Sequence, residues 1–235
     1  MPRRTFRRLD DGELLATLGR LRDRIRERFP GSGLEEVATD LQEVARSVVA
    51  LTAGLGRPQW LIRGAAGVGI AAMALVLVAV ARTLELPAGI RGLGELIQAS
   101  DAAVSLLLVL GASVFFLLTL ETRLKRRRAL DSLHQLRSLA HVVDMHQLTK
   151  DPDRVATPRE DTASSPVIDY TPIQLGRYLD YCSELLSIIS KLAALHAQHL
   201  NDPVVLAAVN DVESLAAGLS NTLWQKISLL GAPAR

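Results

Sequence analysis

Two uncharged stretches decide the architecture of this 235-residue chain. Residues 64–81 read GAAGVGIAAMALVLVAVA, and residues 102–120 read AAVSLLLVLGASVFFLLTL. A helix of about 20 apolar residues crosses the ~30 Å hydrocarbon core of a bilayer, because each residue adds ~1.5 Å. We therefore predict an all-α, two-pass transmembrane helical hairpin with helices at about 60–81 and 102–120. The alternative is that both stretches are buried helices of a soluble bundle.

The composition agrees with a membrane protein. The mean hydropathy is +0.21, although 22% of the residues are charged. This composition argues against a simple soluble enzyme, and the single cysteine, Cys182, excludes a disulfide scaffold. A cleaved signal peptide has a short apolar core near residue 1. Here the first apolar stretch begins near Trp60, so we expect a retained span.

Basic residues flank the two stretches asymmetrically. The connecting segment holds only Arg82 and Arg91, whereas seven basic residues lie at the other ends of the stretches. Because such residues favour the cytoplasmic side, we expect both termini in the cytoplasm and a short extracytoplasmic loop. The seven residues that determine topology and face the membrane surface are Arg57, Arg63, Arg123, Lys125, Arg126, Arg127 and Arg128.

The same basic residues suggest a lipid partner. Their position beside a span favours contact with the bilayer and with anionic lipids of the inner leaflet, and we expect no nucleic-acid partner. Arginine outnumbers lysine by 23 to 4, which indicates a GC-rich bacterial genome. We therefore expect the protein in a bacterial inner (cytoplasmic) membrane.

Helical periodicity predicts a cytoplasmic helical hairpin over residues 1–57. Ser32 and Glu35 have the spacing of a capping box, and a turn at residues 29–33 precedes them. Apolar residues with unbroken heptad spacing follow, which predicts coiled-coil-like packing. The two stripes are Leu14, Leu18, Leu21 and Ile25, and then Leu34, Val37, Leu41, Val44, Val48, Leu51 and Leu55.

The rest of the chain divides into four further segments. Residues 58–122 contain the two spans and their loop, in which Ile90, Leu93, Leu96 and Ile97 predict a short interfacial helix. Residues 123–150 read as a juxtamembrane helix, and residues 151–171 as a proline-containing linker. Residues 172–235 predict a second cytoplasmic hairpin, with Thr171 and Asp202 as helix caps.

Small residues in the spans predict helix–helix contact. The pairs Ala65–Gly69 and Gly67–Ala71 have small-xxx-small spacing, which lets helices approach closely. Ser105, Ala112 and Thr119 form a mildly polar stripe on the second span. The spacing leaves open whether these contacts form within one hairpin or between copies.

The histidines and Cys182 are the remaining candidates for chemistry. His134 and His141 share a helix face opposite the apolar stripe, so we interpret them as solvated; a metal or proton-responsive site is the alternative. We interpret His196 as structural, and Cys182 as a small buried hydrophobic residue. We expect no catalytic residue, no metal and no cofactor.

These observations support three hypotheses about function. The first is a non-enzymatic membrane protein whose cytoplasmic helices form a protein-interaction or oligomerisation platform. The second is a subunit of a small oligomeric channel or transport assembly, lined by the Ser105, Ala112 and Thr119 face. The third is a pH- or metal-responsive membrane regulator that uses His134 and His141. Under the first hypothesis we expect the partners to be further copies of the chain or another protein, bound through the cytoplasmic helices.

Overall fold

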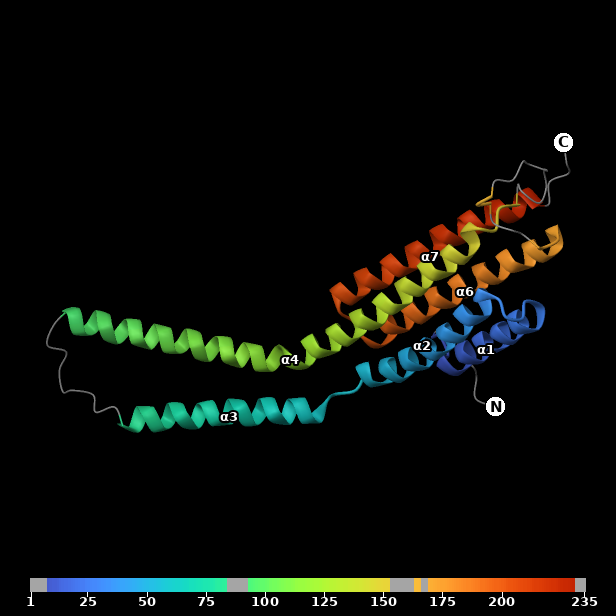
Figure 1. Ribbon diagram of the computed structural model, residues 1–235. Helices are drawn as coiled ribbons and strands as arrows, with labels where there is room; N and C mark the ends of the chain where they lie inside the picture. Colours follow the sequence, from blue (N-terminus) through green and yellow to red (C-terminus); the bar gives the residue numbers. More distant parts are fainter. Residues whose placement is uncertain (1–7, 84–92, 153–162, 166–168, 231–235) are drawn as a thin grey trace. The chain divides into compact units, whose positions relative to one another are not determined.

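The computed structural model describes residues 8–83, 93–152, 163–165 and 169–230. Within these ranges the protein is entirely helical, as predicted, with no strand (Figure 1). The helices are α1 (Asp11–Arg28), α2 (Gly33–Leu55), α3 (Trp60–Thr83), α4 (Leu93–Leu148), α6 (Pro172–His199) and α7 (Pro203–Leu230). The chain forms two compact units. We call the unit made of the residues up to Gly56 and from Arg126 onward the bundle, and the unit Arg57–Lys125 the apolar hairpin.

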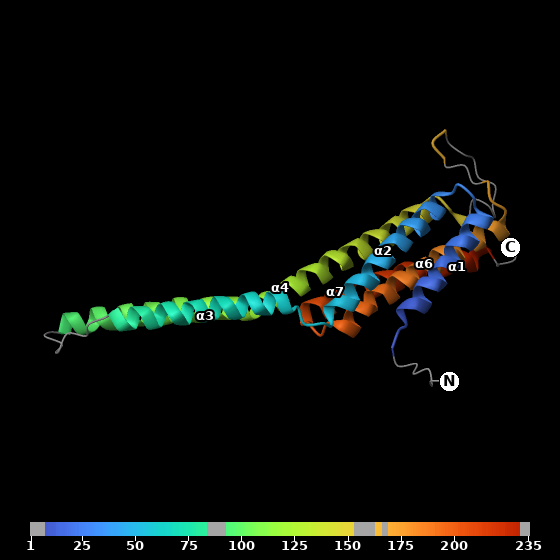
Figure 2. The ribbon, with the colours of Figure 1, turned by 90° about the horizontal axis from the view of Figure 1, so that it is seen from below.

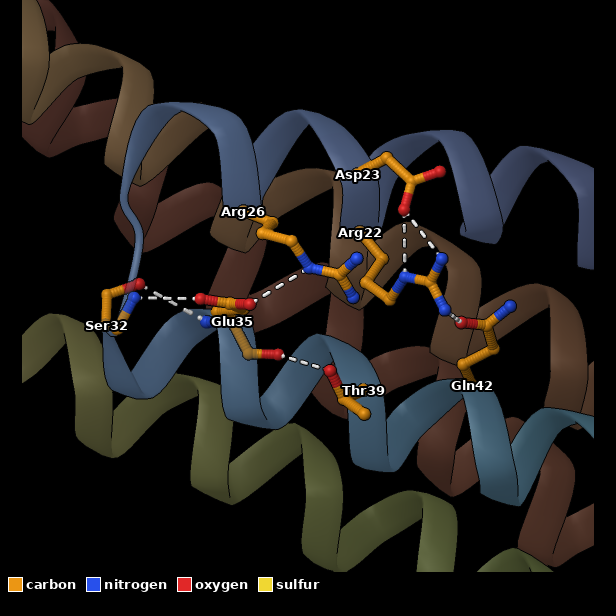
Figure 3. Close-up of polar contacts among 8 residues, drawn as sticks. Arg22, Asp23, Arg26, Ser32, Glu35, Thr39 and Gln42 are labelled. Atoms are coloured by element: carbon orange, nitrogen blue, oxygen red, sulfur yellow. Dashed lines mark hydrogen bonds and ion pairs between the residues drawn. The ribbon is translucent and has the colours of Figure 1, made fainter.

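Local polar contacts fix the helix starts in the bundle. The Ser32 hydroxyl accepts a hydrogen bond from the Glu35 N–H at 3.3 Å, as the capping spacing predicts (Figure 3). The Glu35 carboxylate does not accept a hydrogen bond from the N–H of Ser32, as a complete capping box would have it. It accepts hydrogen bonds from the Gly31 N–H at 2.9 Å and from Arg26 Nε at 3.1 Å. Gly31 has φ +69°, a conformation that favours glycine and closes the turn between α1 and α2.

The predicted apolar stripes form one core in the bundle. Leu14, Leu18, Leu21 and Ile25 of α1 are all buried, and so is most of the α2 stripe. Beside that stripe, Ala38, Ala45 and Thr52 are also buried, because α2 packs against both α1 and α6 rather than along a single two-stranded seam. The second half of α4 adds Ala129, Leu133, Leu136, Ala140 and Val143 to the same core.

α6 is the central helix of the bundle. It packs against α1, α2 and α7, and 13 of its 28 residues are buried. α7 also has 28 residues, but only Val205, Val209, Val212, Ala216 and Leu223 are buried. α6 is therefore covered on most sides, with α1 and α2 running alongside it in Figure 2, whereas α7 lies at the surface of the bundle (Figure 1).

The apolar hairpin pairs α3 with the first half of α4 (Figure 1). α4 begins at Leu93 and continues without a break to Leu148, well beyond the stretch 102–120. Leu93 and Ile97, which we expected in a separate interfacial helix, belong to the first turns of α4. Ile90 and most of the predicted linker lie outside the described residues.

Candidate membrane hairpin and the polar contacts at its ends

The surface of the apolar hairpin resembles the interior of a soluble protein in its chemistry. α3 and α4 each contain an 18-residue window apolar enough to cross a membrane, with mean hydropathy 2.1 within Trp60–Ala79 and 2.2 within Val104–Leu148. These windows are not packed into a core: Val68 and Leu75 are each 71% exposed, and Leu107 is 70% exposed. A contiguous apolar surface of this kind marks contact with a membrane or with another protein.

One of the predicted small residues brings the two helices together. A Cβ added at Gly69 would lie 3.2 Å from Cδ1 of Leu117, so the absence of a side chain lets α3 approach α4 there. The adjacent Ala66, which the small-residue spacing did not single out, is 8% exposed. The other small residues of the predicted pairs and stripe do not share this contact: Ala65, Gly67, Ala71, Ser105 and Ala112 are exposed, and Thr119 is half-buried.

A hollow of about 250 Å³ lies between α3 and α4 in the hairpin. Its lining is wholly apolar, with Met73 and Leu77 from α3 and Leu106 and Leu110 from α4. Such a surface offers no hydrogen-bonding group to orient a polar substrate. The hydroxyls of Thr119 and Ser113 on α4 do not provide such a group, because each donates to a carbonyl of its own helix, at 2.9 Å and 2.8 Å respectively.

An ion-pair network closes the end of the hairpin where α3 begins. Glu121 of α4 accepts hydrogen bonds from Arg63 Nε at 2.6 Å and from the Gln59 N–H at 3.1 Å. Lys125, one turn further along α4, lies 2.8 Å from the same carboxylate and donates to the Arg57 carbonyl at 2.7 Å. The network therefore joins the entry of α3 to the middle of α4.

Glu121 is the residue of this network that the sequence analysis missed. We treated Arg57, Arg63 and Lys125 only as basic flanks, although the structure gathers them around one carboxylate. The available signal was the i,i+4 spacing of Glu121 and Lys125, which places opposite charges on one face of a helix.

The basic residues that follow the second span differ in their surroundings. Lys125 is buried, with 8% exposure, and forms an ion pair with Glu121. Arg123 lies over the Phe116 ring, with its guanidinium carbon 5.6 Å from the ring centroid. Arg127 and Arg128 are exposed. Arg123, Arg127 and Arg128 are therefore accessible at the surface, whereas Lys125 is not.

Arg126 pairs with the cap of α7 inside the bundle. Its guanidinium donates to Asp202 Oδ2 through Nε at 2.9 Å. Nη2 of the same guanidinium lies 2.7 Å from the same oxygen. The other oxygen of Asp202 accepts from the N–H groups of Val204 and Val205, as expected for a helix cap. Burial by itself would raise the pKa of this carboxyl, but Arg126 and the two backbone donors hold the pKa below its usual value.

The structure separates the histidines. His134 and His141 are exposed on α4, whereas His196 is completely buried. Nδ1 of His196 lies 3.2 Å from the Leu192 carbonyl, and Nε2 is buried without a hydrogen-bond partner. Burial lowers the pKa of His196, because the interior disfavours the charged ring. Among the described residues, no three His, Cys, Asp or Glu side chains are grouped so that they could hold a metal ion.

Cys182 lies fully buried on α6. Burial raises the pKa of its thiol to about 12, so the reactive thiolate is suppressed at neutral pH. His134 instead lines an open hollow between α2 and α4, of about 590 Å³, together with Asp40, Glu43 and Asp131. The lining of the hollow also includes Ser138, but among the described residues no hydrogen bond joins its hydroxyl to His134, or His134 to a carboxylate, as the nucleophile and base of covalent catalysis would be joined.

An aromatic cluster fixes one end of the bundle. Tyr170 and Tyr178 stack with their ring centroids 5.6 Å apart, and Phe29 meets each of them edge-on at 5.4 Å. Lys150 lies over both tyrosines, with Nζ 5.0 Å and 5.8 Å from their centroids. These contacts tie the segment after α4 to the start of α6 and to the end of α1.

Comparisons with known proteins give no relative for this chain. No family model, no curated protein and no solved structure matches it. Any functional conclusion therefore rests on the residues and their geometry.

Proposed function

We propose that this chain is a non-enzymatic integral protein of a bacterial inner membrane, whose cytoplasmic bundle serves as a protein-interaction or oligomerisation platform. The observation that carries the proposal is the exposure of apolar side chains along both helices of the hairpin, as at Leu75 and Leu107. In water these side chains would be unfavourable by roughly 25 cal/mol per Å² of apolar surface, whereas lipid tails remove that cost.

The charge distribution supports an orientation with both termini in the cytoplasm. The exposed Arg127 and Arg128 follow the apolar part of α4, and Arg57 precedes α3. Under the positive-inside rule these residues belong on the cytoplasmic side, near anionic headgroups. In the proposed orientation the bundle also lies in the cytoplasm, because both of its chain segments continue from that end of the hairpin.

Reporter fusions after residues 57, 92 and 130 test the topology. We expect cytoplasmic reporter activity at 57 and 130, and extracytoplasmic activity at 92. Cytoplasmic activity at all three positions, with the protein in the soluble fraction, would refute the membrane proposal. Cytoplasmic activity at 92, with the protein in the membrane fraction, would refute the proposed topology of two spans with both termini in the cytoplasm.

The platform function is tested on the full-length protein in nanodiscs. We expect either self-association or the specific capture of a protein partner, with the partner bound to the bundle. A monomer that captures no partner would remove this function. A closed ring of several copies with ion conductance would instead favour a channel subunit, for which the exposure of Ser105 and Ala112 on α4 is the supporting observation.

A further inference from the structure

The outward side of α7 differs from every other helix surface of the bundle in its charge. Fifteen residues of α7 are exposed, and only one of them, Asp211, is charged. We call this surface the α7 outer face. It consists of Pro203, Val204, Leu206, Ala207, Asn210, Asp211, Ser214, Ala217, Gly218, Asn221, Thr222, Trp224, Gln225, Ser228 and Leu229.

The other helices present charged surfaces to the solvent. Six of the nine exposed residues of α1 are charged, and so are four of the eight exposed residues of α2. The exposed residues of α4 within the bundle include Arg127, Arg128, Asp131 and Arg137. An uncharged helix surface in such a chain is therefore a local property of α7 and does not reflect the overall composition.

The chemistry of the α7 outer face limits what can cover it. It has no basic residue, so anionic lipid and nucleic acid gain no attraction there. A partner selected by opposite charge would find only Asp211. A neutral surface, in contrast, complements an identical neutral surface, since pairing two copies brings few like charges together.

The shape of the face fits close helix packing. Ala207, Ser214, Ala217 and Gly218 are small, and a Cβ at Gly218 would meet nothing within 4 Å. Trp224 is 58% exposed at the edge of this surface, and tryptophan is among the residues that dominate binding energy at interfaces. Small residues beside one large aromatic residue let a second helix approach and give it an anchor.

We propose that a second copy of this chain packs on the α7 outer face. This inference rests on the proposed oligomerisation function and specifies its partner and its surface. Fifteen residues on each side are fewer than the ~20–30 of a standard interface, so the contact is weak for molecules in free solution. Confinement of both copies to one membrane raises their effective concentration and offsets that weakness.

Cysteine cross-linking of the full chain in proteoliposomes tests the proposal. The test variant is Ser214→Cys on the α7 outer face, and the matched control is Ser47→Cys on the exposed side of α2. The native Cys182 is fully buried and contributes little background. We expect Ser214→Cys to form a disulfide-linked dimer at least tenfold faster than Ser47→Cys, with a yield that falls as lipid dilutes the protein.

A second variant separates the interface from a chance collision. Ala217→Glu adds a negative charge beside Asp211 on each copy, so like charges meet whichever way the two α7 helices run. It should lower the cross-linking of Ser214→Cys about tenfold, whereas Ala50→Glu on exposed α2 should leave it unchanged. Equal cross-linking of Ser214→Cys and Ser47→Cys, or no effect of Ala217→Glu, overturns the proposal.

The outcomes also distinguish this proposal from the platform function. An oligomer that cross-links through Ser47→Cys but not through Ser214→Cys overturns the proposed surface and leaves the platform function in place. Cross-linking of Ser214→Cys to a different protein overturns the second copy as the occupant. A monomer in nanodiscs that captures no partner overturns both.

Discussion

The bundle and the apolar hairpin are both helical and both rich in leucine, valine and alanine, yet the bundle buries its large apolar side chains and the hairpin exposes many of them. In the bundle, Leu185 and Leu186 are completely buried, whereas in the hairpin Leu107 is 70% exposed and Leu118 is 67% exposed. The difference lies in the distribution of charge along the sequence. Charged residues recur at helical spacing in the bundle helices and are absent from residues 64–81 and 102–120. A helix with one apolar and one charged face is typical of packing against a protein core. A helix that is apolar on all sides over about 20 residues is typical of an apolar environment such as lipid.

The largest expected effect is the loss of a buried leucine from the bundle. Leu185→Ala should lower the free energy of unfolding of the bundle by about 2–5 kcal/mol, because it removes buried surface and leaves a cavity. Leu107→Ala, the matched change in the hairpin, should alter that free energy by less than about 0.5 kcal/mol. Urea unfolding followed by Trp224 fluorescence, in a Trp60→Phe background, measures the bundle alone. Equal losses from the two substitutions would mean that the two units unfold as one.

The next effect concerns the cap of α7. Asp202→Ala should destabilise the bundle by roughly 2 kcal/mol, because it removes a helix cap and the partner of Arg126. Arg127→Gln, at the exposed neighbouring position, is the control and should change stability by less than about 0.5 kcal/mol. The same unfolding assay reports both, and a negligible loss for Asp202→Ala would show that the ion pair and the cap are dispensable.

A smaller, pH-dependent effect should come from His196. Its pKa is lowered in the folded protein, so below about pH 6.5 the unfolded chain binds more protons than the folded one. Stability should therefore fall as the pH drops from about 6.5 toward the lowered pKa, by at most ~1.4 kcal/mol per pH unit. Unfolding curves between pH 7 and pH 5 measure the slope. His196→Leu should flatten it, and an unchanged slope in this variant would assign the acid sensitivity to other groups.

The smallest effect is expected at the exposed histidines. Replacing His134 and His141 together with alanine should cost less than about 1 kcal/mol, because both lie on the solvated side of α4. Elemental analysis of chelator-free protein accompanies this measurement. One transition metal per chain, released by the double substitution, would contradict the interpretation and favour a metal-dependent regulator.

Much of the fold could be predicted from the sequence because local signals are strong. The stripe of α1, the Ser32 cap and the Thr171 cap all lie where the sequence predicted them. Their information is contained within one or two helical turns, so it can be found without knowing the tertiary structure.

What could not be predicted depends on contacts between distant segments. The sequence gives no direct sign that Arg126 meets Asp202, or that Lys150 meets Tyr170 and Tyr178. Nor does periodicity reveal that α6 is covered on most sides, because an amphipathic stripe identifies one buried face and not how many neighbours a helix has. In the hairpin, spacing offered several small residues, and only the pairing of α3 with α4 selects Gly69.

The division of the bundle between two distant segments has a consequence for the order of events during synthesis. α2 ends at Leu55, and its central partner α6 begins at Pro172, with the whole hairpin between them. At ~5–20 residues per second, a ribosome needs roughly 6–25 s to make the intervening segment. Until the second half of α4 has been made, the buried faces of α1 and α2 have only each other, and the neighbours that α6 provides for Leu34, Leu41 and Val48 come later still. The bundle can be completed only after the hairpin has left the ribosome, which places synthesis of the hairpin before final packing of the bundle.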